Sequence, residues 1–360
     1  MTMTSSGLWW WDGNSSHDLD VWKAAWESLP ERRPHYHPSF VTTLCPADRH
    51  PAAVYYEGPQ KSCILYPFWI GNLKDLDFCP QNLQGTCDIV SPYGYGGPSY
   101  HGPSELQGKV EGEFRKLFSA VCRERGVVSE FVREDIFNDH IVQDVGERIY
   151  RQDNVVVRLG LSEEEHLRRY KHKVRKNVRR AREAGLKVIF DEQGERLSDF
   201  LDVYYSTMER TGASSYFFFS EEVLAELVNG LGLGKGLIFV HVMDGGRVVS
   251  TELLLLSRDS LYSFLGGTLE TSRAKRPNDL LKHETILWGG RSGFKHYVLG
   301  GGVEAGDGIF RFKEAFDPES ILPFSTRQRI HDPTAYEELV AARASVQPPP
   351  RSDFFPRYRA

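Results

Sequence analysis

Apolar residues in the first half of the chain recur in short runs that glycine and proline interrupt, a pattern typical of β-strands. Such runs predict strands at 52–56, 63–69, 87–90, 127–132 and 154–159. One segment differs, because its apolar residues recur every three or four positions from Leu106 to Val121. This spacing predicts a helix that starts with a capping box of Ser104 and Gln107 and ends at Gly126.

The second half repeats the mixture of strand and helix patterns. Ser162 and Glu165 predict a capping box, and the helix that follows is expected to run to Ala184 and stop at Gly185. The turn residues 244–247 lie between two apolar runs and predict a β-hairpin. The remaining patterns predict strands at 186–190, 237–243, 248–256, 261–265 and 297–299, and helices at 197–208, 220–228 and 279–291.

The order of these elements predicts the fold class. In each half, antiparallel strands precede a helix and a late strand, which favours an α/β fold with mixed sheets (α+β layering) over a doubly wound parallel sheet. A length of 360 residues suits two domains better than one. We therefore expect an N-terminal domain over 1–155 and a second domain over 156–335. A mobile C-terminal tail is expected over 336–360, where residues 347–350 are typical of an extended linker.

Composition excludes several classes of protein. Hydrophobic residues make up 40% of the chain and charged residues 26%, which is typical of a globular protein with a sizeable core. The chain has no run of about 18 apolar residues, so no membrane span is expected. Residues 1–16 lack the pattern of a secretory signal, which makes the cytoplasm the expected location.

Cysteine and histidine spacing gives no metal or disulfide pattern. Five cysteines without a Cys-x-x-Cys pair argue against a disulfide framework and against a zinc knuckle. His35 and His37 are close in the sequence, but no pattern of carboxylates or cysteines accompanies them. We therefore expect no metal site and structural, reduced thiols.

Charge is concentrated in one segment. The net charge is −5, yet residues 168–182 hold nine Lys or Arg and no acid, which leaves 35 basic against 49 acidic residues elsewhere. One interpretation is a solvated helix face that acids of the same protein balance. The other is contact with the phosphates of a nucleic acid or a phosphorylated substrate. The candidate phosphate-binding residues are Arg168, Lys171, Arg175, Lys176, Arg179 and Arg182.

Two glycine-rich segments are candidates for ligand binding. Residues 300–305 fit the pattern G-x-G-x-x-A, but residues 306–308 prolong the loop and 309–313 resemble a strand, which argues against a dinucleotide site. Lys313 follows this loop, where a cation can meet developing negative charge. The loop 91–98 is interpreted either as a structural turn with packed rings or as a loop that presents the hydroxyls of Tyr93 and Tyr95 to a ligand. The chain has neither G-x-S-x-G nor His-Glu-x-x-His, so covalent acyl-enzyme chemistry has no support.

Several short motifs, taken in order, resemble the Fem-type (FemABX-like) branch of the GNAT acyltransferases. The basic helix ending in Ala-Gly-Leu and the tyrosine-glycine loop are also similar to segments of that family. The motifs lie at 91–98, 168–185, 204–212, 216–218, 265–268, 299–302, 307–308 and 312–316. Two features depart from the family: no long helical arm is present, and no glycine-rich loop for coenzyme A leads into the helix near Arg276.

The resemblance implies two tandem GNAT-like domains with a cleft between them, an acceptor side in the first and the acyl-transfer site in the second. It implies transfer of an aminoacyl group from aminoacyl-tRNA to the amine of a small peptide, amino-nucleoside or cell-wall precursor, in a natural-product or peptidoglycan pathway. The alternatives are an N-acyltransferase that uses acyl-CoA or a carrier protein, and a non-catalytic protein that binds tRNA or a precursor. No cofactor is expected besides this donor, and the oligomeric state is left open.

The resemblance also implies roles for individual residues. Lys313 is expected near the transferred acyl group, where it stabilises the oxyanion or the terminal ribose hydroxyl, and Asp307 is a candidate base. Backbone N–H groups near 253–255 are expected to assist. The basic helix is expected to hold the tRNA acceptor stem. The expected substrate-binding residues are Tyr93, Tyr95, Arg210, Tyr216, Thr268 and Phe312.

Overall fold

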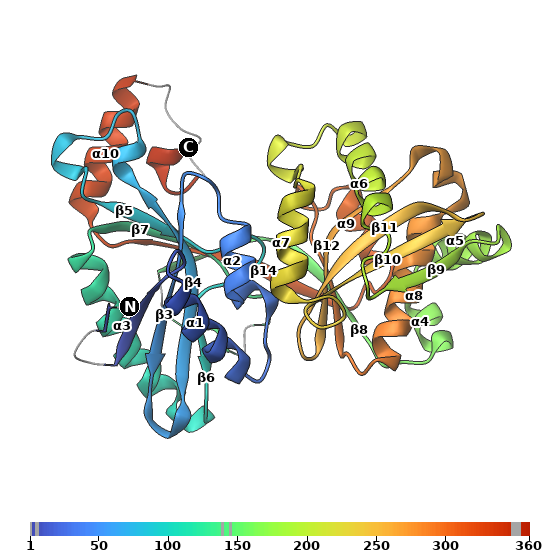
Figure 1. The fold of residues 1–360 in the computed structure, drawn as a ribbon, viewed down its shortest axis with the longest axis horizontal. Coiled ribbons are helices and arrows are strands. Elements are labelled where there is room, and N and C mark those ends of the chain that lie inside the picture. The colour runs from blue at the N-terminus through green and yellow to red at the C-terminus, as the bar shows by residue number, and fades with distance from the viewer. Residues whose placement is uncertain (1, 4–6, 138–139, 144–145, 347–353) are drawn as a thin grey trace. The chain divides into compact units, whose positions relative to one another are not determined.

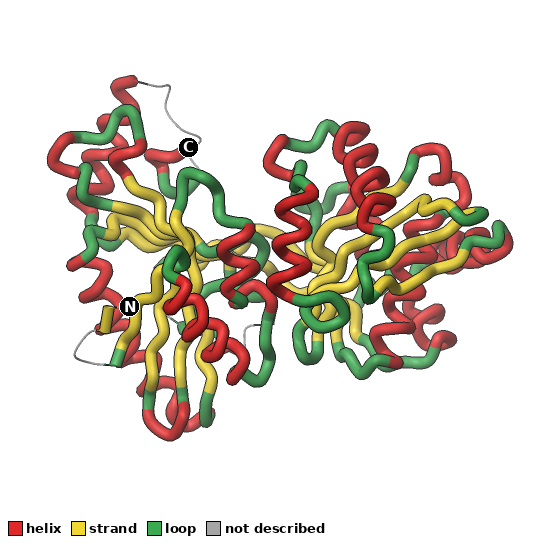
Figure 2. Tube along the Cα trace, viewed as in Figure 1, coloured by secondary structure: helices red, strands yellow, loops and turns green. Residues whose placement is uncertain are grey.

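The computed structural model describes residues 2–3, 7–137, 140–143, 146–346 and 354–360. The chain forms two compact units, one from residues 1–151 and 324–360 and the other from residues 152–323. Figure 1 shows the elements of both, and Figure 2 shows helices beside the strands in each unit. The mixed α/β class is confirmed, because both units combine antiparallel and parallel strand pairs. The division falls at 151/152 instead of 155/156, and the first unit also includes residues 324–335.

Unit 1 contains an antiparallel meander followed by a parallel pair. Strands β2, β3 and β4 pair antiparallel in sequence order, β5 follows β4, and β7 lies parallel to β5. The sheet is completed by β14, which comes from the far end of the sequence and pairs antiparallel with β7. The bounds are β1 Thr2–Met3, β2 Leu8–Asp12, β3 His50–Glu57, β4 Cys63–Asn72, β5 Cys87–Val90, β6 Ser99–His101, β7 Val127–Arg133 and β14 Ile321–Ile330.

The helices of unit 1 cover its sheet with apolar side chains. The α3 residues Val110, Phe114 and Phe118 pack with the strands into one core. The helix begins at Gln107, because 104–106 form a 3₁₀ turn and Ser104 makes no cap bond to it, so the predicted capping box is wrong here. The helix bounds are α1 Ser16–Ser28, α2 Pro38–Thr43, α3 Gln107–Glu124 and α10 Pro333–Val346.

The C-terminal segment is part of the packed unit wherever it is described. Helix α10 places Tyr336 and Leu339 against Val128 and Leu73 in a second core, which also holds the fully buried Tyr358. The Tyr358 hydroxyl lies 2.6 Å from the Ser129 hydroxyl. The described residues of 336–360 therefore differ from the expected mobile tail, while the predicted linker 347–350 lies outside the described residues.

Unit 2 has the same order of strand pairings as unit 1. Strands β9 to β12 form an antiparallel meander, β13 lies parallel to β12, and β8, which precedes the other strands of this unit in the sequence, pairs antiparallel with β13. The predicted hairpin is confirmed, with Gly245 and Gly246 at its turn and positive φ at both. The bounds are β8 Glu147–Arg158, β9 Lys187–Asp191, β10 Leu237–Asp244, β11 Arg247–Leu256, β12 Ser260–Thr268 and β13 His296–Gly300.

Helices lie on both faces of the unit 2 sheet. Along β10, Ile238 and Val240 join the core formed with α5 and α8, whereas Phe239 packs its ring against Phe200 of α6 at 5.0 Å. This alternation is the two-residue period of a strand buried on both faces. The helix bounds are α4 Glu163–Arg169, α5 His172–Glu183, α6 Leu197–Thr211, α7 Glu221–Leu231, α8 Pro277–Arg291 and α9 Gly308–Glu314.

The basic helix is interrupted between α4 and α5. The capping box of Ser162 and Glu165 is confirmed at its start. Tyr170 then leaves the helical conformation (ψ 141°), and the Lys171 N–H donates to the carbonyl of Ala315 at 2.9 Å. The buried Tyr170 ring packs edge-on against Phe316. Tertiary contacts therefore override the helical spacing at this point. Among the described residues, no helix is both long and apolar enough to span a membrane.

Candidate acyl-transfer site

Two parallel strands of unit 2 pair over only part of their length. Strand β12 pairs with β13 through residues 260–262 and 296–298, and then each strand continues along its other neighbour. The pairing of β11 with β12 shifts register between Leu253 and Leu254, in the segment predicted to supply an N–H donor. In unit 1, by contrast, the parallel pairing of β5 and β7 continues to Val90 and Phe131. The ends of β12 and β13 thus leave backbone groups that do not pair with each other.

The segment after β13 forms a loop and then a helix. The expected strand at 309–313 is wrong: these residues lie in α9, and the Asp307 carboxylate caps the helix by accepting the Phe310 N–H at 2.7 Å. The same carboxylate accepts the N–H of Val303 at 2.8 Å. Helix α9 has only seven residues and begins after the glycine run has ended, so the geometry still differs from a dinucleotide site.

Lys313 of α9 turns back onto this glycine loop. Its Nζ donates to the carbonyl oxygen of Gly301 at 2.6 Å. A side chain at position 301 would collide with Gln152 and Asn154, since a Cβ there would lie 2.7 Å from both. Burial and the charge of Lys282 lower the pKa of Lys313 to about 8, while Glu252 and Asp307 act in the opposite direction. Lys313 therefore places a partly desolvated cation beside the end of β13.

A buried polar network lies next to Lys313 and was not predicted from the sequence. Lys282 of α8 donates to Glu252 of β11, to Ser263 of β12 at 3.0 Å and to the Tyr297 hydroxyl of β13 at 3.1 Å. The Tyr297 hydroxyl in turn donates to Glu252 at 2.6 Å. The available signal was the single acid within the apolar run 248–256, because a charge in a buried strand requires a partner.

The Asp307 carboxylate forms hydrogen bonds with backbone N–H groups. Its oxygens accept the N–H groups of Val303, Glu304 and Phe310, and these bonds, led by the one from Phe310, lower the pKa of its carboxyl. A carboxylate held in its charged form by donors is a weak proton acceptor. The geometry therefore gives Asp307 a capping role, and its role as a base stays a prediction.

Four predicted substrate-binding residues lie in unit 2 with Lys313. Phe312 packs its ring edge-on against Phe316 at 5.4 Å, and Thr268 at the end of β12 shares a hydrogen bond with the Ser250 hydroxyl at 2.7 Å. Arg210 pairs with Glu270 at 3.2 Å. Tyr216 is 44% exposed and lies in the 3₁₀ turn Ser215–Phe217. Their substrate contacts stay predictions.

The other two predicted residues, Tyr93 and Tyr95, lie in unit 1. They belong to the glycine loop after β5, and the Tyr95 ring packs edge-on against His35 at 5.3 Å and Phe324 at 5.7 Å. Both side chains are half-buried. A common acceptor site with Tyr216 of unit 2 stays a prediction.

Acids of the same unit pair with much of the basic segment. Arg175 donates instead to the carbonyls of Leu167 and Tyr170. Within the described ranges, Lys173, Lys176 and Arg180 are exposed and form no ion pair. The ion pairs are Arg168–Glu164, Arg169–Asp317, Lys171–Glu314, Arg179–Glu183, Arg182–Glu163 and Arg182–Glu284. Phosphate contact stays a prediction, and three cations remain available for it.

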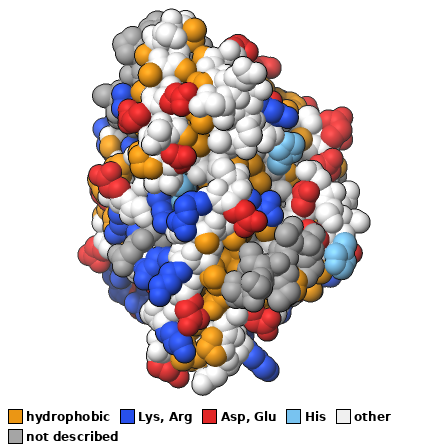
Figure 3. All heavy atoms as spheres, turned by 90° about the vertical axis from the view of Figure 1, so that its left-hand side faces the viewer, with side chains coloured by type: hydrophobic (Ala, Val, Ile, Leu, Met, Phe, Trp, Pro, Cys, Tyr) orange, Lys and Arg blue, Asp and Glu red, His pale blue; other side chains and the backbone are white. Residues whose placement is uncertain are grey.

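Unit 1 shows acids and bases interspersed on the face drawn in Figure 3.

A second cationic position lies at the start of α8. Arg276 precedes this 15-residue helix in the left-handed conformation (φ 63°), and its buried Nε has no hydrogen-bond partner among the described residues. Arg273 and Lys275 are exposed close by in the sequence. A helix N-terminus with unsatisfied N–H groups and a cation is suited to an anion such as phosphate.

One protein-family model matches part of the chain. Residues 168–314 match the family model described as Acetyltransferase (GNAT) domain. This match covers α5, β9 to β13, the glycine loop and Lys313. A search of curated protein sequences gave no match.

Solved structures match over most of the chain. FemX is similar with a TM-score of 0.68 and 11% identity, over 89% of this chain and 98% of FemX. L-PGS from Bacillus licheniformis has a TM-score of 0.56 and 10% identity, over 93% and 97%. The C-terminal domain of a candidate lysylphosphatidylglycerol synthetase from Agrobacterium fabrum has a TM-score of 0.54 and 11% identity, over 91% and 96%. Residues 168–314 therefore match a GNAT acetyltransferase domain model, and the fold of the chain, with two GNAT-like units, is similar to that of FemX.

Proposed function

We propose that the protein is an aminoacyltransferase that moves an aminoacyl group from aminoacyl-tRNA to the amine of a small peptide, amino-nucleoside or cell-wall precursor. The observation that carries the proposal is Lys313, a desolvated cation bound to the Gly301 carbonyl where β12 and β13 part. FemX and the named lysylphosphatidylglycerol synthetase share the fold, and the second is named for an aminoacylated lipid.

The proposed reaction needs no acyl-enzyme. The neutral amine attacks the ester carbonyl carbon, and the new C–N bond forms as the carbonyl electrons move to oxygen. The Lys313 ammonium stabilises that oxyanion. The C–O bond to the terminal ribose then breaks, and the ribose hydroxyl takes up a proton that the amine has released. Positioning supplies on the order of 7 to 11 kcal/mol at best, and one oxyanion donor adds about 3 to 4 kcal/mol.

The lysine is suited to this role because its neighbours fix it. The carbonyl of Gly301 accepts one ammonium hydrogen, which leaves two hydrogens for a ligand. The Glu252–Lys282 pair, with less than a tenth of each side chain exposed, adds a second cation that is already neutralised. Lys313 is then the cation of this cluster that an oxyanion is able to use. Phosphates of the donor are assigned to Lys173, Lys176 and Arg180.

A second candidate is an N-acyltransferase that uses acyl-CoA. The unpartnered Nε of Arg276 at the start of α8 supports it, because a pyrophosphate would satisfy both this group and the helix N-terminus. The same site would suit the terminal phosphates of tRNA. The donor therefore has to be identified by experiment.

The purified protein is incubated with total tRNA charged with radiolabelled amino acids, and in parallel with radiolabelled acetyl-CoA and longer acyl-CoA esters. Acceptors are a panel of amino-nucleosides, short peptides and peptidoglycan stem peptides. We expect a labelled amide from the tRNA arm that RNase pretreatment abolishes. An RNase-resistant amide from the CoA arm alone would establish the second candidate. Binding of charged tRNA without transfer in either arm would indicate the non-catalytic alternative.

A further inference from the structure

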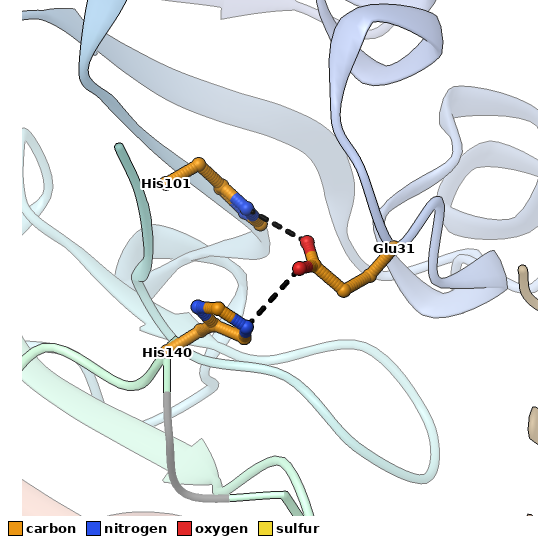
Figure 4. A group of neighbouring side chains, drawn as sticks. All are labelled: Glu31, His101 and His140. Carbon is orange, nitrogen blue, oxygen red and sulfur yellow. Dashed lines mark ion pairs between the residues drawn. The ribbon is translucent and has the colours of Figure 1, made fainter. Parts of the chain in front are cut away.

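Three segments of unit 1 that are distant in the sequence bring two imidazoles to one carboxylate. Glu31 lies between α1 and α2, His101 ends β6, and His140 lies in a loop after β7. The Oε2 atom of Glu31 lies 3.0 Å from Nδ1 of His101, and its Oε1 atom lies 3.1 Å from Nε2 of His140. Figure 4 shows both rings on one side of the carboxylate.

The side chains converge on a shared volume. One ligand atom from each of the three residues can be chosen so that all lie within 4.8 Å of one another. Tetrahedral zinc with bonds of 2.0 to 2.2 Å separates its ligand atoms by about 3.3 to 3.5 Å, so small side-chain shifts would seat an ion. Nδ1 of His101 and Oε2 of Glu31 are close but do not meet with hydrogen-bond geometry, although both atoms are buried.

The surroundings orient His101 as a metal ligand. Its second ring nitrogen, Nε2, lies 3.1 Å from the buried hydroxyl of Ser99. A hydrogen bond at one imidazole nitrogen fixes the tautomer and directs the other nitrogen toward the ion. The His101 and His140 rings are stacked, with centroids 5.5 Å apart and an angle of 19° between planes, so each ring limits rotation of the other.

The donor atoms select the class of metal. Two imidazole nitrogens and one carboxylate oxygen suit Zn²⁺, whereas Ca²⁺ and Mg²⁺ require six or more oxygen ligands. The side chains of Glu31, His101 and His140 are 20%, 8% and 28% exposed, so the site reaches solvent and leaves room for water as a fourth ligand. We propose that Glu31, His101 and His140 bind one Zn²⁺ ion, which ties these three segments of unit 1 together.

The experiment measures metal in the full-length, tag-free protein. The protein is stripped with a chelator, incubated with Zn²⁺ and desalted, and its zinc content is measured by mass spectrometry. We expect about one zinc per chain in the wild type, and loss of this zinc in His101→Ala and in His140→Ala. The control is His17→Ala, which removes an exposed histidine of the same unit and is expected to keep the zinc.

A spectrum of the wild type keeps the test independent of how the variants fold. Stripped protein titrated with Co²⁺ is expected to develop the visible bands of a tetrahedral site, and Zn²⁺ is expected to displace them. Ser99→Ala is expected to weaken Co²⁺ binding by about 10- to 100-fold. A wild type without stoichiometric zinc and without these bands would overturn the proposal. So would stoichiometric zinc that folded His101→Ala and His140→Ala proteins retain.

Discussion

Asp307 illustrates how one carboxylate is used at the residue scale. The family resemblance made it a candidate base, whereas its oxygens accept three backbone N–H groups at the start of α9. If capping is its role, Asp307→Asn should retain the single-turnover rate within a few-fold, since asparagine caps as well as aspartate. Asp307→Ala should lower the thermal stability of the protein, because alanine cannot cap the helix. A rate loss of a hundred-fold in Asp307→Asn, with unchanged thermal stability, would restore the base.

The lowered pKa of Lys313 predicts a pH dependence. Burial and Lys282 place the pKa near 8. The ammonium is therefore complete below this pH and is lost as the pH rises through about 8. The single-turnover rate should then show a descending limb near pH 8, superimposed on the rise from acceptor deprotonation. Lys313→Arg keeps its charge over this range and should lack the limb. The same limb in both proteins would assign it to another group.

The candidate site was predictable in part at this scale. Lys313 was predicted because a cation follows a strand and a glycine loop, and the structure places it on the Gly301 carbonyl. Glu252 and Lys282 were missed because they lie 30 residues apart and meet only when α8 packs on the sheet. Spacing along one sequence does not report such contacts. The cluster of Glu31, His101 and His140 was missed for the same reason, since these residues lie in three segments that are distant in the sequence.

At the scale of elements, the basic helix α5 carries a prediction about salt. Lys173, Lys176 and Arg180 form no ion pair within the described ranges, whereas Arg168 pairs with Glu164. Replacing those three with glutamine should flatten the dependence of log Kd for charged tRNA on log salt by about 0.7 to 0.9 per contact. The single change Arg168→Gln, measured as control, should alter the slope less than any one of the three. An unchanged slope in the triple variant would remove phosphate contact from the account.

Most elements were predicted from the pattern of apolar residues, and each exception has a physical cause. Strands β3 to β5 and the hairpin β10–β11 were predicted because short apolar runs and the turn residues between them are local features of the sequence. Helix α9 was missed because its cap, Asp307, lies in a glycine-rich loop. The break at Tyr170 was missed because it depends on Phe316 and Ala315, more than 140 residues away.

At the scale of the whole molecule, unit 1 takes its last strand from the far end of the sequence. Strand β14 completes the sheet of unit 1 after the continuous segment 152–323 has formed unit 2, so the two units are not simple consecutive segments. Two domains were predicted from the length of the chain and from the similar mixture of strand and helix patterns in each half. The position of β14 in the sheet of unit 1 was not predicted, because the residue pattern of a single strand such as 321–330 does not indicate which sheet the strand joins.

The C-terminal residues predict a large effect on stability. Tyr358 is fully buried, and its hydroxyl contacts Ser129 and Asp88. Tyr358→Ala should lower the free energy of unfolding of unit 1 by about 3 to 5 kcal/mol, because it leaves a cavity in the core. Phe354 is 47% exposed, so Phe354→Ala should change it little. Equal, small effects of both changes in chemical denaturation would mean that this segment does not stabilise the unit.

The most direct test of the account is the rate of amide formation in Lys313→Met under single-turnover conditions, with the donor that the transfer assay identifies. The matched control is Lys295→Met, which removes a lysine that lies just before β13 and has 72% of its side chain exposed. The account predicts a rate about a hundred- to a thousand-fold lower in Lys313→Met and near wild type in Lys295→Met. Rates within a few-fold of each other, in two folded variants, would contradict it.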